Sequence, residues 1–377
     1  IKESQMIGYN HSVSLRGAKN LIKTLGHKRT FLFEGETGIG KSYILYSLID
    51  EFGDKYGYNI VDCTTLDVGD IQMPRVVEMN GMHVTVFAPN HLLGFQDDKP
   101  QIIMFDELGK APQGTLNGIL PILQERRQGM NYLPEGSLVL ATTNCASDGL
   151  MDTLKAHQRR RTVKVLVRKP HAGIGVDENG KEFVEPDSWM EYALDNDIAP
   201  EVIMFVRNHP DCLESYLDGS DSKRIFNPSR EPSVDAFVCP FTLEAASDII
   251  KAKDKLSEEE LTASLCGAIG TLSGVDLMTE VKMGYKLPDW GNLLSNPKTA
   301  PIPEDTMVQC MLMTKAIVTT AEDTLTALCQ YMMRDKFKDE WEAVFYRSIM
   351  SSKKQEIAID NDTFQKRAME MNWIFTK

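Results

Sequence analysis

The segment Gly35–Ser42 constrains the fold of this 377-residue chain more than any other feature. It reads Gly35-Glu36-Thr37-Gly38-Ile39-Gly40-Lys41-Ser42, which fits the phosphate-binding pattern GxxxxGK followed by Ser or Thr. The apolar run Thr30–Glu34 precedes it, and apolar residues at helical spacing follow it from Tyr43. A buried strand, a glycine-rich loop and a helix are the setting that this pattern requires.

The residue types in this loop suit a triphosphate. Glycines allow backbone N–H groups to surround the α- and β-phosphates, and the helix N-terminus adds partial positive charge. Lys41 can bridge the β- and γ-phosphates, and the Ser42 hydroxyl can ligate Mg²⁺. We therefore predict that residues 35–42 bind ATP together with Mg²⁺. GTP is disfavoured because the chain has no NKxD segment.

Two acids follow another apolar run, Gln101–Phe105. Because ligands bind at the carboxyl ends of strands in open α/β sheets, we expect these acids on the strand adjacent to the loop. Asp106 is predicted to hold Mg²⁺, directly or through water, and Glu107 to accept a proton from the attacking water. Glu107 is the main reason to predict turnover. The run Leu138–Thr143 ends in Asn144, which is predicted to hydrogen-bond that water or the γ-phosphate.

Short apolar runs alternate with helical stretches in the first half of the chain. Five of them predict a mainly parallel five-stranded sheet with helices on both faces. They are Thr30–Glu34, Asn59–Asp62, Gln101–Phe105, Leu138–Thr142 and Val163–Val167. Asn-Gly pairs predict β-hairpin inserts at Arg75–Phe87 and Val176–Val184, and a Pro-Glu-Gly turn marks a third excursion at Gln128–Ser137.

Helices are predicted beyond about residue 187. Asp187 or Ser188 can cap one helix, Pro200 can open another, and the pattern stays mostly helical from Leu243 onward. Two apolar stripes at helical spacing are predicted to be core faces. Their members are Leu325, Leu328, Cys329 and Met332 in one, and Trp341, Val344, Phe345 and Ile349 in the other.

The order of these motifs resembles that of AAA+ ATPases, and the finer likeness is to the MoxR branch with its CbbQ- and NorQ-like members. The segments that carry it are Gly35–Ser42, Asp106–Ala111, Leu123–Arg127, Ala199–Ile203, His209–Leu213 and Leu287–Asp289. The resemblance implies an α/β nucleotide-binding core (1–168), a hairpin and helical connector (169–235), an α-helical lid (236–300) and a helical C-terminal extension (301–377).

The resemblance also implies a homo-oligomeric ring, usually a hexamer, with ATP at the subunit interfaces. An arginine of the neighbouring subunit would stabilise the charge on the γ-phosphate. The best match to that arginine is Arg160, with Arg159 and Arg161 as close competitors. Ile7 and Gly8 match the segment that lines the adenine pocket in such proteins.

One position departs from the branch. Its members usually carry an arginine at the start of the lid, where this chain has Phe241 in Cys239–Glu244. A phenyl ring cannot contact phosphate as a cation does. Two interpretations follow: Arg230 substitutes from the preceding loop, or lid closure is coupled weakly to ATP. The second is slightly favoured.

The work implied by the resemblance is chaperone-like remodelling or activation of a client protein, such as one with a von Willebrand A-type domain. The inserts 75–87 and 128–137 would face the pore or the client. One alternative is a nucleic-acid motor subunit resembling McrB, which Arg126, Arg127 and Arg159–Arg161 could support. Another is a nucleotide-gated scaffold with slow turnover, which the missing lid arginine motivates.

The composition limits which partners, locations and metal sites can be expected. A formal charge of −13 repels nucleic acid at long range and makes that partner unlikely. No apolar run reaches the ~20 residues that span a bilayer. The seven cysteines show no zinc-binding spacing, so we expect buried free thiols, no protein-held transition metal and a cytoplasmic location.

Overall fold

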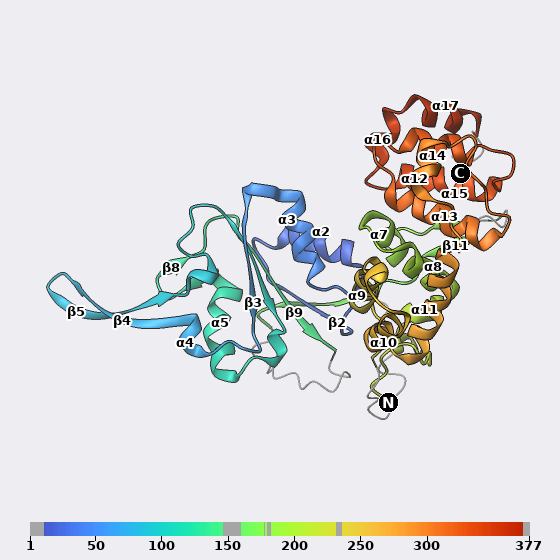
Figure 1. Cartoon of the computed structure of the whole chain (residues 1–377). Coiled ribbons are helices and arrows are strands. Elements are labelled where there is room, and N and C mark those ends of the chain that lie inside the picture. The colour runs from blue at the N-terminus through green and yellow to red at the C-terminus, as the bar shows by residue number, and fades with distance from the viewer. Residues whose placement is uncertain (1–10, 146–159, 177, 179–181, 231–235, 372–377) are drawn as a thin grey trace. The chain divides into compact units, whose positions relative to one another are not determined.

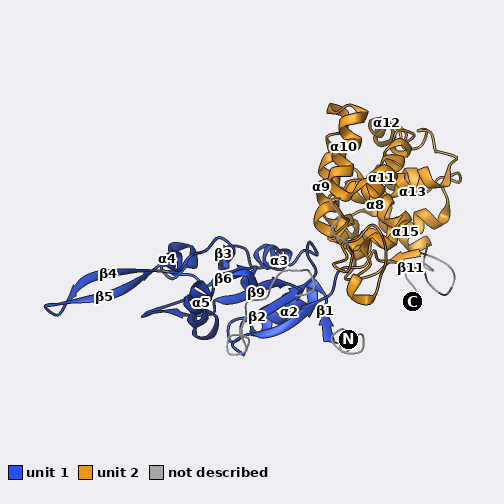
Figure 2. Cartoon of the chain, turned by 90° about the horizontal axis from the view of Figure 1, so that it is seen from below, with its two compact units in different colours: residues 1–169 blue, residues 170–377 orange. Residues whose placement is uncertain are grey.

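The computed structural model describes residues 11–145, 160–176, 178, 182–230 and 236–371 (Figure 1). Ile7, Gly8 and Arg159 lie outside the described residues. The chain divides into two compact units, Ile1–Lys169 and Pro170–Lys377 (Figure 2). The predicted division of the second half into connector, lid and extension remains a prediction.

The first unit is built on a parallel sheet of six strands, in the order β1-β10-β2-β9-β6-β3. They are β1 (Ser12–Val13), β2 (Phe31–Gly35), β3 (Gly57–Asp62), β6 (Gln101–Asp106), β9 (Leu138–Asn144) and β10 (Val163–Val167). All five predicted strands are confirmed. The predicted number was wrong by one, because the two-residue β1 is too short to show a periodic pattern.

The placement of the acids also differs from the prediction. Asp106 ends β6, and β9 lies between β6 and β2, so the acids are not on the strand adjacent to the loop. The intervening strand is the one that ends in Asn144. All three strands are parallel, so their carboxyl ends still meet at one edge of the sheet.

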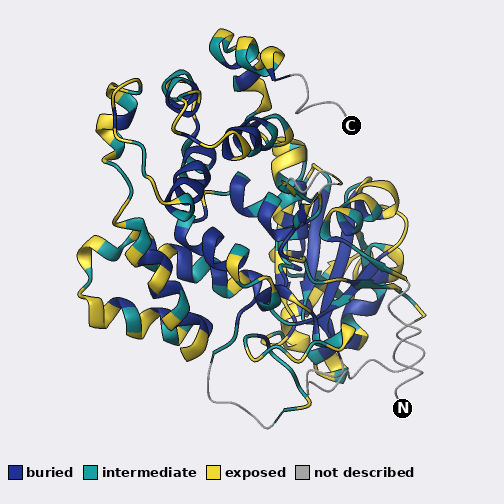
Figure 3. Cartoon of the chain, turned by 90° about the vertical axis from the view of Figure 1, so that its right-hand side faces the viewer, coloured by how far each residue is buried: buried dark blue, intermediate teal, exposed yellow. Residues whose placement is uncertain are grey.

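Alternating side chains of the central strands face two separate cores. Phe31 and Phe33 pack with α2 (Leu15–Leu25) and α3 (Tyr43–Phe52), whereas Leu32 packs with α4 (Val68–Ile71) and α5 (Gln113–Glu125). Because successive side chains of a strand point to opposite faces, a strand buried on both faces is apolar throughout. Figure 3 shows strands of the sheet in the buried colour, and β2, β6 and β9 are the mostly buried ones, whereas β1, β3 and β10 are more exposed. The fold is a mainly parallel α/β sheet with helices on both faces, followed by a helical C-terminal region.

Two hairpins extend from this unit. β4 (Gln72–Met79) and β5 (Met82–Pro89) form the predicted Asn-Gly hairpin, with φ of 54° at Asn80 and 77° at Gly81. In Figure 1 it projects well beyond the sheet. The third excursion contains the shorter pair β7 (Arg127–Gln128) and β8 (Asn131–Tyr132). Asn131 Nδ2 donates to the Phe87 carbonyl at 3.4 Å, which joins the two hairpins.

Where the structure describes it, the second unit is helical apart from the hairpin of β11 (Ile174–Val176) and β12 (Glu182–Val184). The predicted Asn179-Gly180 turn of this hairpin lies outside the described residues. Ser188 caps α7 and Pro200 opens α8, as predicted. Both predicted stripes lie in one shared core, with Val344 at its partly buried margin. The α-helices described in this unit are α7 (Trp189–Asp195), α8 (Pro200–Asn208), α9 (Pro240–Lys251), α10 (Glu258–Ile269), α11 (Thr271–Gly284), α12 (Trp290–Ser295), α13 (Thr306–Thr319), α14 (Leu325–Met332), α15 (Asp339–Ser351), α16 (Gln355–Ile359) and α17 (Asp362–Glu370).

Glu280 on α11 should make the stability of this unit depend on pH. Burial raises the pKa of its carboxyl above the ordinary 4.5, although a hydrogen bond from Asn208 and the nearby His209 oppose the shift. The folded chain therefore holds this proton more tightly than the unfolded chain. Its contribution to stability is greatest at low pH and declines as pH rises above 4.5.

Glu280→Gln removes this titration and keeps an acceptor for Asn208. We expect its melting temperature, relative to wild type, to rise by roughly 2 °C or more between pH 5 and pH 8. Thermal melts at several pH values measure this trend. Glu259→Gln, at an exposed position of α10, is the matched control. An equal trend in both variants would contradict the assignment to Glu280.

Among the described residues, no helix combines the length and the apolar character needed to cross a membrane.

Candidate active site

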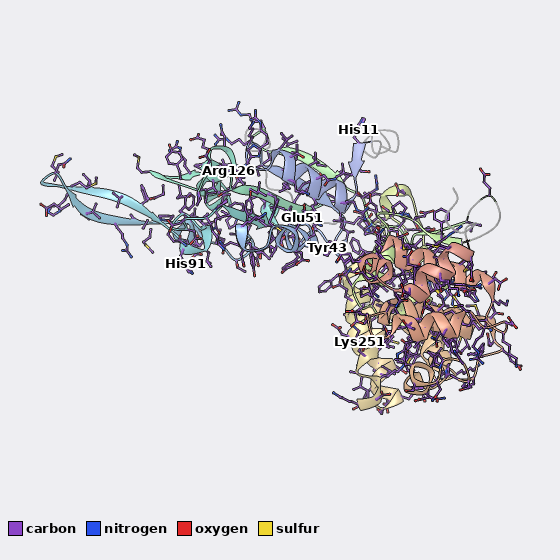
Figure 4. The ribbon with its side chains drawn as sticks, turned by 90° about the horizontal axis from the view of Figure 1, so that it is seen from above. His11, Tyr43, Glu51, His91, Arg126 and Lys251 are labelled. Carbon is purple, nitrogen blue, oxygen red and sulfur yellow. The ribbon has the colours of Figure 1, made fainter. Side chains whose placement is uncertain are left out.

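The predicted phosphate-binding loop joins β2 to α3, which begins at Tyr43 (Figure 4). Gly38 and Gly40 have φ of 72° and 91°, a region that favours glycine. Gly35 is needed for a different reason, since a Cβ there would lie 2.6 Å from Cδ1 of the fully buried Ile39. The positive φ of Gly38 and Gly40 and the close packing of Gly35 against Ile39 therefore set the shape of this loop.

Lys41 is the buried cation of the loop. Its Nζ donates to the carbonyl oxygens of Gly35 at 3.0 Å and Glu36 at 2.8 Å, and to Oδ1 of Asn144 at 2.8 Å. An ammonium group has three N–H donors. Contact with a phosphate would therefore exchange one or more of these bonds for phosphate oxygens.

Asn144 connects the loop to the acids. Its Oδ1 accepts from Lys41, and its Nδ2 donates to Glu107 Oε1 at 2.7 Å. The position of β9 between β2 and β6 makes this bridge possible. Lys41, Asn144 and Glu107 thus form one continuous chain of hydrogen bonds at the sheet edge.

The two acids are held in different ways. The Thr142 hydroxyl donates to Asp106 Oδ1, and the Glu107 backbone N–H donates to Thr142 Oγ1 at 3.3 Å. Glu107 has φ of 52°, which is uncommon for a residue with a side chain. Lys110 Nζ lies 3.2 Å from Glu107 Oε2. One carboxylate oxygen of Glu107 therefore accepts a hydrogen bond from Asn144, and the other forms an ion pair with Lys110 without a hydrogen bond.

Ser42 and Asp106 supply the oxygen donors that Mg²⁺ prefers. Among the described residues, no three or more His, Cys, Asp or Glu side chains gather as ligands. This set fits magnesium, which proteins usually bind through one or two carboxylates together with substrate phosphates. Ser42 precedes the first residue of α3, and its side chain makes no capping hydrogen bond there.

Two further residues lie at the acidic edge. Asp62 ends β3 opposite Asp106, and hydrogen bonds from the Thr64 hydroxyl and N–H lower the pKa of its carboxyl. Burial raises the pKa of the adjacent Cys63 thiol, and the charges of Asp106 and Asp62 raise it further. Cys63 therefore stays a neutral thiol and is not a nucleophile.

The arginines named from the sequence have different surroundings. Arg126 (Figure 4) is tied to backbone oxygens of its own unit, and burial lowers its pKa to about 10. Arg127 pairs with Glu125 at the surface, and Arg160 is exposed. Arg230 donates to the Ser222 carbonyl at 2.8 Å and to Asp221 Oδ1 at 2.9 Å, bonds that it would give up to reach a nucleotide.

The match with a known family lies within the first unit. Residues 30–160 match the AAA domain of the dynein-related subfamily. The match covers about a third of the chain, from the strand before the loop through Asp106, Glu107 and Asn144 to Arg160. Members of the AAA family are ATPases that generally bind ATP with Mg²⁺.

Two curated relatives match a similar share of the chain. Chaperone protein ClpB of Helicobacter hepaticus is 26% identical over 153 residues, which are 37% of this chain and 17% of that protein. ClpB of Wolinella succinogenes is 26% identical over 154 residues, with the same coverage. The matched region thus spans only about a sixth of the length of these relatives.

Solved structures with a related arrangement include closed-state Hsp104 with ATPγS and FITC-casein, at 18% identity over 38% of this chain and 29% of that chain (TM-score 0.28). NtrX from Brucella abortus is 13% identical over 70% of this chain and 66% of that chain (TM-score 0.31). At these TM-scores neither structure adds to what the family match shows.

Sequence reasoning missed Thr142 and Lys110. Thr142 precedes Asn144 by two residues on β9, so both side chains point to the same face of the strand. That spacing is a signal that could have identified Thr142. Lys110 lies three residues after Glu107 in a short helical turn, where an ion pair of this kind is common.

Proposed function

We propose that this chain is a MgATP-dependent ATPase of the MoxR branch that couples hydrolysis to remodelling of a partner protein. The observation that carries the proposal is the chain of hydrogen bonds from Lys41 through Asn144 to Glu107. It unites a phosphate-binding cation and a candidate base at one edge of the sheet.

The residues divide the work as follows. The loop amides and Lys41 would hold the phosphates, and Ser42 and Asp106 would hold the metal. When bound, Mg²⁺ would supply positive charge that offsets the charge of the phosphates. Glu107 accepts a proton from the attacking water, and the Asn144 amide orients that water or the carboxylate. Lys110 keeps a positive charge beside the Glu107 carboxylate.

A partner protein is supported by the two hairpins of the AAA domain. Their exposed large apolar side chains include Val76, Met79, Met82, Met130 and Tyr132, and Met130 is 89% exposed. Methionine is flexible and polarizable, and it is common on surfaces that bind varied partners. An ATP-driven movement of these hairpins would act on such a partner. The ring, with Arg160 supplied by a neighbouring subunit, belongs to the same proposal.

The nucleic-acid alternative is weakened by Arg126. Its guanidinium donates to backbone oxygens and so is not a surface phosphate contact. The remaining candidates, Arg127 and Arg159–Arg161, are few in a chain of net charge −13. ATPase stimulation by DNA with a strong salt dependence would favour that alternative. Multiple-turnover kinetics separate an active ATPase from a slow scaffold.

Calorimetry with MgATP and phosphate-release assays test the ATPase directly. We expect Lys41→Ala to weaken nucleotide binding by at least about tenfold, because a charge-assisted contact to phosphate contributes about 1.5–3 kcal/mol. Lys28→Ala, at an exposed position before β2, is the matched control. No heat of MgATP binding to the wild type at millimolar nucleotide would defeat the proposal.

A further inference from the structure

We infer that Thr142 is a positioning residue for both acids of the site. Its hydroxyl holds the side chain of Asp106 and the backbone N–H of Glu107. The inference rests on the proposed ATPase function and deepens it. Thr142 is fully buried on β9, one strand away from the phosphate-binding loop. Its single hydroxyl contacts Asp106 and Glu107, two consecutive residues with different predicted roles.

The first contact concerns the metal ligand. The Thr142 hydroxyl donates its proton to Asp106 Oδ1. A carboxylate with one oxygen fixed in this way keeps the other oxygen in a defined direction. Groups that hydrogen-bond a metal-binding carboxylate orient it and change metal affinity, even though they do not touch the metal.

The second contact concerns the candidate base. The same hydroxyl oxygen accepts from the Glu107 backbone N–H at 3.3 Å. Glu107 has φ of 52°, a conformation that surrounding contacts must maintain in a residue with a side chain. A hydroxyl can donate once and accept at the same time, so one side chain satisfies both groups. Loss of this bond would release the backbone that directs the Glu107 carboxylate toward Asn144.

The neighbouring residue provides a matched comparison. Thr143 is buried on the same strand, but successive side chains of a strand point to opposite faces. Thr142→Val removes the hydroxyl and keeps the shape of the side chain. Thr143→Val makes the same chemical change on the other face, and Thr142→Ser restores the hydroxyl.

The decisive measurements are ATP turnover and the Mg²⁺ dependence of ATPγS binding by calorimetry. For Thr142→Val we expect kcat to fall by about 10- to 100-fold, and the Mg²⁺ concentration for half-maximal binding to rise by a similar factor. Binding in EDTA should stay within about threefold of wild type, because the loop is unchanged. Thr142→Ser and Thr143→Val should stay within about threefold in all assays.

The outcomes separate this inference from the proposed function. If the wild type turns over ATP and Thr142→Val behaves like Thr143→Val in both kcat and Mg²⁺ dependence, the positioning role is wrong and the ATPase stands. If the wild type binds MgATPγS without turnover, a raised Mg²⁺ requirement in Thr142→Val still supports the role, and an unchanged one overturns it. A wild type that binds no nucleotide would overturn both.

Discussion

Glu107→Gln should reduce ATP turnover by about 10²- to 10⁴-fold and leave nucleotide affinity within about threefold of wild type. Glutamine is nearly isosteric and can still accept the hydrogen bond from Asn144 Nδ2. It cannot accept a proton from water at neutral pH. The expected loss therefore falls on the chemical step, and phosphate release under saturating MgATP measures it.

The control for this substitution is Glu125→Gln, at the exposed end of α5 beside Arg127. It should leave both turnover and affinity unchanged. Phosphate release by Glu107→Gln at the wild-type rate would show that another group activates water. If the mechanism holds, the nucleotide-bound Glu107→Gln variant should retain its client, and a pull-down with it would identify that partner.

Arg126→Ala should lower the stability of the first unit by at least about 3 kcal/mol, since hydrogen bonds to a charged group contribute about 1.5–3 kcal/mol each. Arg126 Nη1 donates to the Leu123 carbonyl at 2.5 Å and to the Thr30 hydroxyl at 2.7 Å, and Nη2 donates to the Gly26 carbonyl at 2.8 Å. These contacts join the ends of α5 and α2 to the start of β2. Denaturant unfolding followed by circular dichroism measures the change.

The adjacent Arg127 is the natural control. It pairs with Glu125 at the surface, and exposed ion pairs contribute between zero and about 1 kcal/mol. Arg127→Ala should therefore change stability by less than about 1 kcal/mol. Equal effects of the two substitutions would show that the hydrogen bonds of Arg126 stabilise the fold no more than the surface ion pair of Arg127 does.

Local pattern was sufficient for most of the fold of the first unit. Strands buried on both faces are apolar throughout, and each of the five predicted runs is a strand. The hairpin at Asn80-Gly81 was predictable because its turn needs positive φ at both positions. The strand β1 was missed because two residues carry no period.

The arginines show where local pattern fails. Arg126 and Arg127 are adjacent in a basic segment, and the sequence offers no reason to separate them. In the structure one ties backbone oxygens together and the other lies at the surface. Burial is a property of the packed chain, so charge in a sequence does not reveal whether a cation is available to a ligand.

By itself the sequence located the candidate groups of the site: a glycine loop with Lys41 and Ser42, and strands that end in Asp106, Glu107 and Asn144. These patterns are local, because each depends on residues that are neighbours along the chain. Only the tertiary structure decided that β9 lies between β2 and β6, so that Asn144 links Lys41 to Glu107 and Thr142 contacts both acids. Strand order is set by packing between residues far apart in sequence, and it has no local signature.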